Sequence, residues 1–536
     1  MDRLGRRELL SLTSGLALSI PLLGLSGCGG SGEAPGKTLR RSTSSEPRTL
    51  DPQLVSGNSA ALVYDMFEGL LTIDASGKER PGLAERYDVS PDGLTYTFVL
   101  RDNLKWSDGK PITSEDVLYT YRRAVNPKVA ARGGRSLFKV INYRAVLTGR
   151  LPVEDLGVSA PDARTVVIKL AEPAPYMGEL IASSSLAIVP GHVIEKHGKQ
   201  WTAPGNMVTA GAYKLAEVVP NTYVKLVRNP NYYEADQVKI EEVLYYGIAN
   251  PATALTQFRA KELDIVFGVP LNRLEELQKD YARELHEEPS LGVFYILLNN
   301  QKAPTNDVRV REALSLAVQR DRMSKSILRG EGNIASGIVP SSMPDYRPAP
   351  LPFEDAGVAE RQARARELLA AAGYTAAKPL NITYKFGGVE INRLIAVALQ
   401  SMWEELGSVK VTLENVGASG VIRDGGTGDY EAMRYTYYAL YSDPVAMLKL
   451  LETDNVMNIS RYSSPKFDTA LKEADEIVDP KARLLRLAEV EKLGMNEFPV
   501  IPIYYNKRFY LVSQKVEGWV DNVRGKHPTR FMSFKA

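Results

Sequence analysis

The first half of the chain shows the alternation of hydrophobic and polar positions that half-buried β-strands have. Apolar side chains occupy every second position in residues 94–100, and residues 166–170 repeat this pattern. Residues 212–219 and 222–227 flank Pro220-Asn221, a pair that favours a tight turn between two strands. We therefore expect strands in this half, two of which form a hairpin at Pro220-Asn221.

The second half mixes this alternation with helical spacing. Residues 380–386 predict a strand, residues 395–406 carry apolar side chains three or four places apart, and residues 409–413 alternate again. Such a β-α-β unit favours parallel strands with a right-handed crossover. Another helix is predicted over 360–372, ending at Gly373, because glycine often terminates helices. Strands mixed with β-α-β units predict an α/β fold with more than one lobe.

The composition limits the classes of protein that the chain can belong to. A chain of 536 residues is long enough for several domains, since a typical domain has roughly 100–200 residues. Its 66 basic and 64 acidic residues leave a net charge of +2, and neither sign forms a long run. This balance gives no indication of nucleic-acid binding, and no nucleic-acid partner is expected. Cys28 is the only cysteine in the sequence, so the chain cannot form an intramolecular disulfide.

The N-terminus has the features of a lipoprotein export signal. Basic residues near the start precede an apolar stretch, residues 9–25, that is short and interrupted by small residues. The stretch ends in Leu25-Ser26-Gly27-Cys28, which resembles the bacterial lipobox, where the cysteine is lipidated and becomes the new N-terminus. Residues 1–27 are therefore predicted to be a signal peptide, and the glycine-rich residues 28–38 a flexible tether. A buried free cysteine is the alternative interpretation of Cys28.

The same region sets the expected location. Arg6-Arg7 resembles part of a twin-arginine export signal, so the export route stays open. No other stretch of the sequence is long and apolar enough to cross a bilayer. We expect an extracytoplasmic protein, in the periplasm or on the outer cell surface, anchored to the membrane by a lipid on Cys28.

Several long motifs, in order along the chain, resemble one family. Residues 83–123, which include Trp106-Ser107-Asp108-Gly109, are similar to the signature of the large (family 5) extracellular solute-binding proteins. Residues 201–213, 298–311 and 498–505 are similar to the oligopeptide-binding branch of that family. The resemblance covers essentially the whole chain after the tether, and members of the family bind oligopeptides, dipeptides, nickel complexes and other solutes.

The resemblance implies a two-lobed, periplasmic-binding-protein type II-like α/β fold with mixed sheets, a hinge between the lobes and one lobe split into two subdomains. Lobe 1 is expected to have a main subdomain and an accessory subdomain, the latter over residues 69–189. Lobe 2 is expected to cover residues 291–505. The main subdomain combines residues 39–68, 190–290 and 506–536.

The resemblance also implies a function. The chain is expected to be the monomeric binding protein of an ABC importer, which captures an oligopeptide or related small solute between closing lobes and passes it to permease and ATPase subunits. In the oligopeptide branch the peptide is held as an added strand through main-chain hydrogen bonds. The resemblance implies no cofactor and no metal.

The segment that matches the family's binding segment, residues 434–444, departs from it at one position. Peptide-binding relatives usually have an aspartate four residues before Pro444, and it pairs with the peptide's α-ammonium; here that position is Leu440. A buried charge that loses its partner is costly, so Leu440 argues against tight capture of a free amine unless another acid substitutes. Asp443 is the nearest candidate, but it also fits the N-cap of a helix running from Pro444 to Leu451. An N-blocked or modified peptide, or a non-peptide solute, is the alternative ligand.

Other candidate contacts come from the same resemblance. Arg434 matches a family arginine that meets a ligand carboxylate, and a solvated strand-edge arginine is the alternative. Tyr437 matches a cleft tryptophan and would stack on a ligand. Alternation places Tyr435 and Tyr437 on one face and Tyr438 on the other, so at least one ring is expected in the core. Ser56-Gly57-Asn58 matches a loop that lines the cleft in relatives, and a plain surface turn is the alternative.

The Trp106-Ser107-Asp108-Gly109 motif is explained by turn chemistry. Its last three residues favour a turn, and Thr113 and Asp116 are spaced as the N-cap and third residue of a helix. We expect the motif to hold the fold together rather than to contact the ligand.

A lipid-anchored hydrolase is the rival class. His286-Glu287-Glu288-Pro289-Ser290 begins like a zinc-protease helix, but Ser290 replaces the second histidine and Pro289 would break the helix. The sequence has no Gly-x-Ser-x-Gly motif, and His192 and His197 are five positions apart, off the same-face helical spacing. No nucleophile–base set supports catalysis, so we expect a binding protein, with no catalytic residues and no metal ligands. A receptor that reports a signal molecule is compatible with the same fold.

Overall fold

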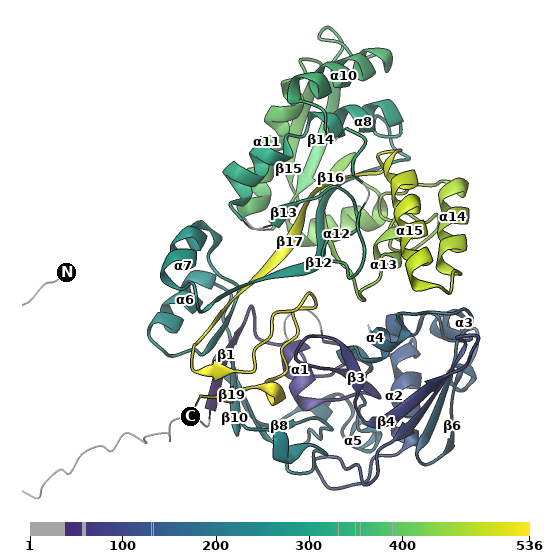
Figure 1. The fold of residues 1–536 in the computed structure, drawn as a ribbon, viewed down its shortest axis with the longest axis vertical. Coiled ribbons are helices and arrows are strands. Elements are labelled where there is room, and N and C mark those ends of the chain that lie inside the picture. The colour runs from purple at the N-terminus through teal and green to yellow at the C-terminus, as the bar shows by residue number, and fades with distance from the viewer. Residues whose placement is uncertain are drawn as a thin grey trace, which may run out of the picture.

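Two lobes joined by long strands make up the protein (Figure 1). The computed structural model describes residues 38–535 except residues 56–59, 130, 132, 331, 349, 354 and 389. Cys28, with the predicted signal peptide and most of the tether, therefore lies outside the described residues. The first strand begins at Thr38, the last residue of the predicted tether.

One large mixed sheet runs through both lobes. Its strands, in order across the sheet, are β15 (Val409–Asn415), β14 (Leu380–Phe386), β16 (Ala432–Tyr438), β12 (Leu285–Leu298), β17 (Val500–Val512), β11 (Ile265–Phe267), β1 (Thr38–Thr43), β10 (Glu242–Gly247), β9 (Tyr223–Arg228) and β8 (Tyr213–Val219), with β13 (Gly332–Ile334) paired to β17. Smaller sheets join β4 (Ala84–Val89), β5 (Thr95–Leu100), β7 (Thr165–Lys169) and β6 (Val158–Asp162), then β2 (Leu71–Ile73) with β3 (Glu79–Pro81), and β18 (Val516–Glu517) with β19 (Ser533–Phe534).

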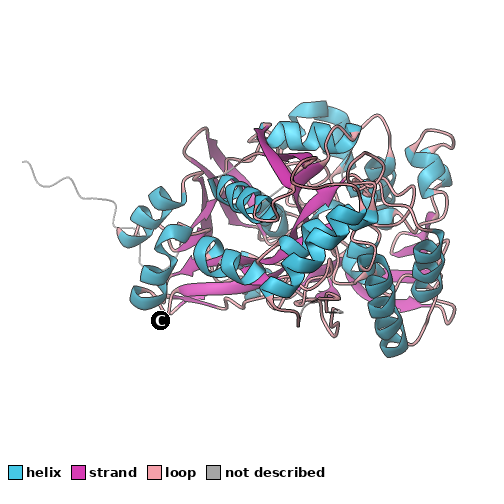
Figure 2. Cartoon of the chain, turned by 90° about the horizontal axis from the view of Figure 1, so that it is seen from above, coloured by secondary structure: helices cyan, strands magenta, loops and turns pink. Residues whose placement is uncertain are grey.

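The helices divide between the lobes in chain order. The lower lobe of Figure 1 holds α1 (Ala60–Met66), α2 (Ser114–Val125), α3 (Tyr143–Leu147), α4 (Met177–Ile181) and α5 (Gly191–His197), and α6 (Pro251–Arg259) and α7 (Leu274–Asp280) lie beside the strands that connect the lobes. The upper lobe holds α8 (Val308–Ala317), α9 (Arg320–Met323), α10 (Val358–Ala371), α11 (Glu390–Glu404), α12 (Gly417–Thr427), α13 (Val445–Leu448), α14 (Pro465–Asp475) and α15 (Pro480–Met495). Seen from above, helices lie over and beside the strands (Figure 2).

The elements predicted from local patterns are present. β8 and β9 form the predicted hairpin, with Asn221 in the left-handed conformation (φ 59°) that a tight turn requires. β14, α11 and β15 form the predicted β-α-β unit, and its two strands pair in parallel. α10 covers the predicted helix, starts two residues earlier and ends before Gly373, whose φ of 90° suits glycine.

β12 and β17 connect the lobes. The first half of β12 pairs with the end of β17 beside the lower lobe, and its second half pairs with the start of β17 and with β16 in the upper lobe. The register between β12 and β17 shifts between Pro289 and Val293, where proline cannot donate to the ladder. A bulge of this kind bends a strand, so the two lobes meet at a bend in a shared sheet.

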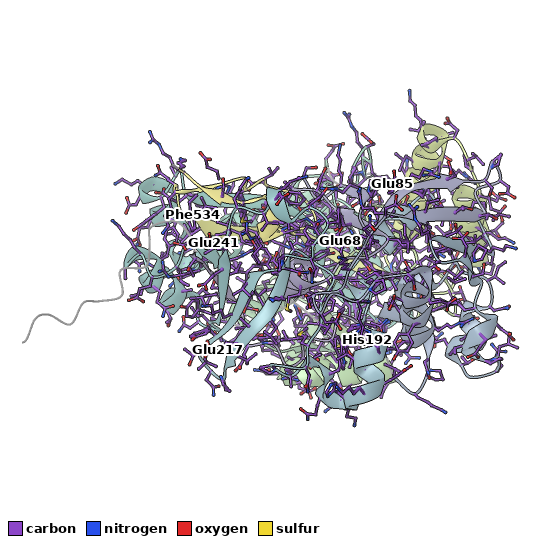
Figure 3. All side chains as sticks on the ribbon, turned by 90° about the horizontal axis from the view of Figure 1, so that it is seen from below. Glu68, Glu85, His192, Glu217, Glu241 and Phe534 are labelled. Carbon is purple, nitrogen blue, oxygen red and sulfur yellow. The ribbon has the colours of Figure 1, made fainter. Side chains whose placement is uncertain are left out.

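The last residues of the chain complete the interior of the lower lobe. Arg530 forms an ion pair with Glu68 at 2.7 Å, and both side chains are almost fully buried. Glu68 lies in the interior of the molecule, whereas Glu217 lies near its outline (Figure 3). Asp65 accepts hydrogen bonds from the backbone N–H of Thr529 at 2.8 Å and from its hydroxyl at 2.6 Å. These contacts fix the C-terminal segment against α1.

Helix α2 begins with the predicted capping box. The Thr113 side chain caps the N–H of Asp116, and the Asp116 carboxylate accepts the N–H of Thr113 at 2.9 Å. The preceding turn is also as expected, with Gly109 at φ 88°. Its residue Ser107 contacts Thr209 through two hydrogen bonds, of 2.9 and 3.0 Å. The Trp106–Gly109 motif therefore ties the region around α2 to the start of β8.

Removing this cap gives a first prediction. Thr113→Ala should lower the free energy of unfolding by about 1 kcal/mol, because it leaves N–H groups of the first helical turn without a partner. Urea unfolding monitored by circular dichroism measures this, and Thr113→Ser should retain most of the stability. Equal loss in the two variants would contradict the capping role.

Candidate ligand-binding site

Arg434 lies on strand β16, in the part of the large sheet that belongs to the upper lobe. Arg434 lies opposite Ile296 of β12, its Nη2 donates to the Thr436 hydroxyl at 2.9 Å, and its guanidinium lies 5.4 Å from the centre of the Phe294 ring. Its Nε is buried and has no hydrogen-bond partner within the part of the chain that the structure describes. This donor of the guanidinium is therefore left unsatisfied by the described residues.

The tyrosines of β16 divide between two environments, as the alternation predicts. Tyr435 and Tyr437 are half-buried, and the Tyr435 ring lies 5.8 Å from that of Tyr295. Burial raises the pKa of Tyr437, so its hydroxyl stays protonated. Tyr438 is 48% exposed and its ring lies over Gly292, where a Cβ would clash with it. Tyr438 is thus the ring that β16 presents at its exposed end.

Leu440 follows β16 and is 44% exposed. The backbone N–H of Ala439 donates to the carbonyl of Leu291 at 2.8 Å, which continues the strand pairing as far as this position. Tyr441 then turns into the core and is only 5% exposed. The segment therefore leaves Leu440 as an apolar side chain at the surface, between two anchored neighbours.

Asp443 is bound by a buried arginine. Its carboxylate lies 2.6 and 3.2 Å from the two Nη atoms of Arg483 on α15, and it accepts the N–H of Val445 at 2.9 Å. Helix α13 starts at Val445, one residue after the predicted first position, and ends at Leu448, before the predicted Leu451. Arg483 also pairs with Asp475 at 2.8 Å. These contacts use the Asp443 carboxylate to hold α13 and α15 together.

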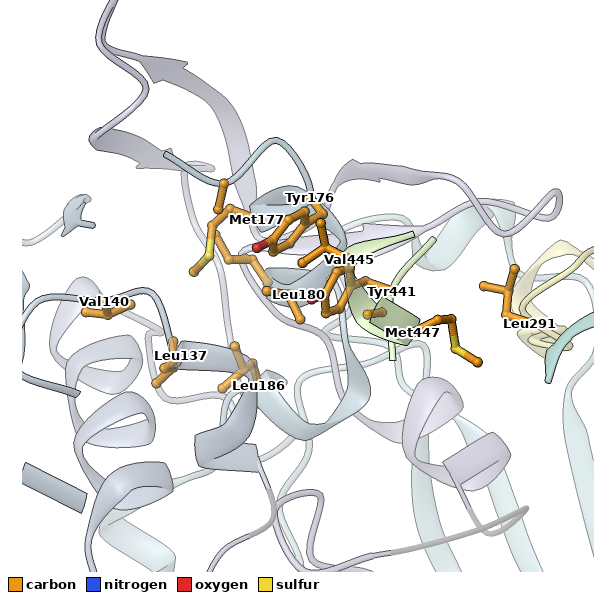
Figure 4. Packing of buried hydrophobic residues seen from close by; sticks show 14 of the residues in the cluster. Leu137, Val140, Tyr176, Met177, Leu180, Leu186, Leu291, Tyr441, Val445 and Met447 are labelled. Carbon is orange, nitrogen blue, oxygen red and sulfur yellow. The ribbon is translucent and has the colours of Figure 1, made fainter. Parts of the chain in front are cut away.

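The lobes touch beside this segment. The rings of Tyr441 and Tyr176 stack with centroids 4.2 Å apart, and the N–H of Ser442 donates to Glu179 at 2.8 Å. Lys139 forms ion pairs with Glu172 at 2.5 Å and, across the boundary, with Asp475 at 3.2 Å. Figure 4 shows Tyr176 of the lower lobe packed against Tyr441 and Val445 of the upper lobe. A continuous apolar cluster therefore joins the lobes.

The structure brings some of the predicted site residues together but not all of them. Arg434, Tyr437, Tyr438 and Leu440 lie on one strand and its extension, and Asp443 lies next to them but is paired. Ser56-Gly57-Asn58 lies outside the described residues. Sequence reasoning missed the lower-lobe side of the boundary, Tyr176 and Glu179, because nothing local to them shows that they meet residues about 260 positions away.

Two other features lie apart from this site. A cavity of about 900 Å³ in the lower lobe is lined by α2, α5 and neighbouring loops, including Tyr119, Arg122 and Trp201.

The His286–Ser290 segment is part of strand β12, so the described structure has no zinc-protease helix there. No cluster of three or more histidine, cysteine, aspartate or glutamate residues able to hold a metal ion occurs within residues 38–535, its gaps aside. In that same portion, no helix is sufficiently long and apolar to span a membrane.

The shared bent sheet, the two lobes and the aromatic end of β16 at their boundary define a two-lobed binding protein. The chain belongs to the bacterial extracellular solute-binding proteins, family 5, whose model matches residues 78–458. This confirms the family and the fold class expected from the motifs.

Individual relatives match over nearly the whole length. The chain is 34% identical over 497 residues to the periplasmic oligopeptide-binding protein OppA of Escherichia coli (strain K12), which covers 92% of this chain and 90% of that protein. It is also 34% identical over 489 residues to the probable deoxycholate-binding periplasmic protein YgiS of the same organism, covering 91% of each. The structure of the Escherichia coli murein tripeptide binding protein MppA matches with a TM-score of 0.83 at 33% identity, over 94% of this chain and 99% of that one.

Proposed function

We propose that this protein captures oligopeptides between its two lobes and delivers them to the membrane permease of an ABC importer. The observation that carries the proposal is the placement of β16. Its exposed end presents Tyr438 and Leu440, with Arg434 four residues before Tyr438, at the boundary where Tyr441 already contacts the opposite lobe. Relatives named for oligopeptide and murein peptide binding share this architecture.

Each site residue has a proposed role. Arg434 meets a ligand carboxylate, because the planar guanidinium suits that geometry. Tyr438 stacks on the ligand, and Tyr437 supports it from the half-buried face. Leu440 contributes an apolar surface where an acid would otherwise stand. Asp443 fixes the segment that carries Leu440 through its ion pair with Arg483. Ser56, Gly57 and Asn58 are further proposed ligand contacts, and they rest on the family resemblance alone.

Ligand capture is coupled to lobe closure. A peptide bound to one lobe and touched by the other stabilises the closed arrangement by the difference between its affinities for the two states. The Tyr176–Tyr441 stack and the Lys139–Asp475 ion pair are contacts of the closed arrangement that need no ligand atoms. They lower the free energy that the ligand must supply.

The remaining parts of the proposal concern organisation and location. Residues 39–68, 190–290 and 506–536 form the main subdomain of lobe 1, residues 69–189 its accessory subdomain, and residues 291–505 lobe 2. A signal peptide over 1–27 directs export, and a lipid on Cys28 anchors a monomeric protein outside the cytoplasm, next to the permease and ATPase subunits. Relatives described as periplasmic binding proteins support this location and a role without catalysis.

Peptide binding is tested by thermal unfolding with matched peptides. We expect tri- to pentapeptides to raise the Tm of the full chain, since a ligand at about one hundred times its Kd stabilises the native state by about 2.7 kcal/mol. Acetylation of the peptide N-terminus should change the shift little, because Leu440 offers the ammonium no carboxylate. The absence of any shift across the set would contradict peptide capture and direct the search to other solutes.

The role of position 440 has its own matched variant. Leu440→Asp should make free peptides bind roughly tenfold more tightly than acetylated ones, because a carboxylate now faces the ammonium at a partly desolvated boundary. Isothermal titration calorimetry measures the two affinities, and Leu440→Asn is the uncharged control. Equal affinities for free and acetylated peptides in Leu440→Asp would show that the ligand's amine does not lie here.

A further inference from the structure

Three cations gather where the C-terminal segment meets the end of β16. Arg508 of β17 lies with its guanidinium 5.7 Å from the centre of the Tyr438 ring. Gly525, at φ 57°, packs so closely on the Arg508 side chain that a Cβ would clash with it. Arg524 and Lys526 flank this glycine. In Figure 1 the loop between β18 and β19 rises from the lower lobe toward the connecting strands.

These cations lie beside the segment that contains Leu440. Glu179 Oε2 accepts the N–H of Ser442 at 2.8 Å, and the same oxygen is 3.7 Å from Nη1 of Arg524. The Arg524 side chain is therefore held next to residues 440–442, although it belongs to the other end of the chain. Arg508 lies over Tyr438, two residues before Leu440.

The segment that carries the cations is held in place. Asn522 Nδ2 donates to the carbonyl of Lys526 at 3.0 Å, and the Lys526 N–H donates to Asn522 Oδ1 at 3.3 Å. A few residues later, Thr529 and Arg530 are bound by Asp65 and Glu68 in the interior. The cations are thus positioned before any ligand arrives, which reduces the entropic cost of binding.

The acids near this cluster do not balance its charge. Glu179 contacts Arg524 but also serves Ser442. Glu288 and His527 form a buried pair at 3.0 Å, and burial raises the pKa of Glu288 and lowers that of His527, so together they add no net charge. Asp521 is bound by His286 at 2.9 Å and by the Trp519 Nε1 at 2.8 Å.

In the described structure Lys526, like Arg508, has no acid of its own. Among the described residues no carboxylate lies within 4.0 Å of its ammonium, which lies 5.7 Å from the centre of the Tyr64 ring. Burial, together with Arg508 and Arg524, lowers the pKa of Lys526 to about 8. A half-buried cation that has only an aromatic ring and no carboxylate beside it destabilises the ligand-free protein, and an incoming anion would remove that cost.

We propose that Lys526, with Arg508 and Arg524 beside it, forms a subsite for a carboxylate of the bound peptide at the end of the ligand that lies beside Leu440. This inference rests on the proposed peptide-binding function and adds a substrate class to it, namely acidic peptides. Leu440 fits this role, because an acid at that position would compete with the ligand's carboxylate for the same cations. The carboxylate belongs to an acidic side chain if the peptide's ammonium lies beside Leu440, and to the peptide's own C-terminus if the peptide is bound in the reverse direction.

The test compares peptides that differ by one charge. Glu-Ala-Ala is paired with Gln-Ala-Ala, and Ala-Ala-Ala as the free acid is paired with its C-terminal amide. Calorimetric affinities are measured for the full chain, for Lys526→Met, and for Lys214→Met as a control, because Lys214 is a half-buried lysine without an ion pair on edge strand β8, within the described residues. At least one pair should differ by roughly tenfold in the unmodified protein and in Lys214→Met, and by much less in Lys526→Met. The pair that responds identifies the source of the carboxylate.

Other outcomes would overturn the inference. Equal affinities within both pairs would contradict the proposed subsite but not the proposed peptide binding. If no peptide binds, both proposals are contradicted. If the charge preference persists in Lys526→Met, residues other than Lys526 are responsible for it. The Tm of ligand-free Lys526→Met should equal or exceed that of the unmodified protein, and a large decrease would indicate a structural role instead. Affinity for the acidic peptide should also fall as the pH rises above about 8, when free Lys526 loses its proton.

Discussion

Arg483→Met is expected to destabilise the upper lobe by about 3–5 kcal/mol. The substitution removes the guanidinium that lies 2.6 Å from Asp443 and 2.8 Å from Asp475, so Asp443 is left buried without a cation while Asp475 keeps only Lys139. Breaking a buried ion pair from one side costs this much because the remaining charge is neither solvated nor paired. Urea unfolding followed by tryptophan fluorescence measures the change as a lower transition midpoint.

Helix α15 supplies a matched control for this prediction. Arg486, one turn later, pairs with Glu473 and Glu489 at the surface. Arg486→Met should change the free energy of unfolding by at most about 1 kcal/mol, since exposed ion pairs contribute little. Similar losses in the two variants would mean that the Arg483 network is as well solvated as a surface pair.

The second large effect is expected for Tyr441→Ala. Tyr441 belongs to the upper lobe, yet its ring stacks on Tyr176 of the lower lobe and lies in the apolar cluster between them. Truncating a buried aromatic ring costs about 3–5 kcal/mol, and much of that loss falls on the closed arrangement alone. A loss of about 2.8 kcal/mol from the closed state would reduce its population relative to the open state roughly a hundredfold, and ligand affinity would fall with it.

Small-angle scattering separates this effect from ordinary destabilisation. Tyr441→Ala should increase the radius of gyration of the ligand-free protein. Tyr462→Ala is the control, because Tyr462 is an equally buried ring that packs against Phe467 of its own lobe. It should lower the Tm without changing the radius of gyration. An unchanged radius in Tyr441→Ala would show that the lobes are held together by other contacts.

The sequence predicted those parts of the fold that depend on near neighbours. The capping box of α2 and the hairpin at Pro220-Asn221 follow from residues a few positions apart, and both are present. The parallel β-α-β unit follows from a change of hydrophobic period over residues 380–413. Long family motifs predicted the two-lobed class.

The composition of the site could be predicted only in part. The aromatic run on β16 and Leu440 are visible locally, but the partner of Asp443 is Arg483, 40 positions away, and capping chemistry alone could not reveal it. The cations of the proposed subsite come from residues 508–526, and only the folded chain brings that region to the end of β16, where Arg508 lies over Tyr438. Pairings of this length depend on the complete tertiary arrangement, which periodicity and turn chemistry do not encode.

The dependence of the lower lobe on the last residues has a consequence for the order of folding. Asp65 and Glu68 are made early in synthesis, but their partners Thr529 and Arg530 are made nearly last. Until then, tyrosine hydroxyls can bind the two acids, but Glu68 lacks its buried cation and Asp65 lacks the two donors of Thr529. The native lower lobe is therefore less stable until the C-terminal segment is made, and the N-terminal region gains its full stability only when synthesis is complete.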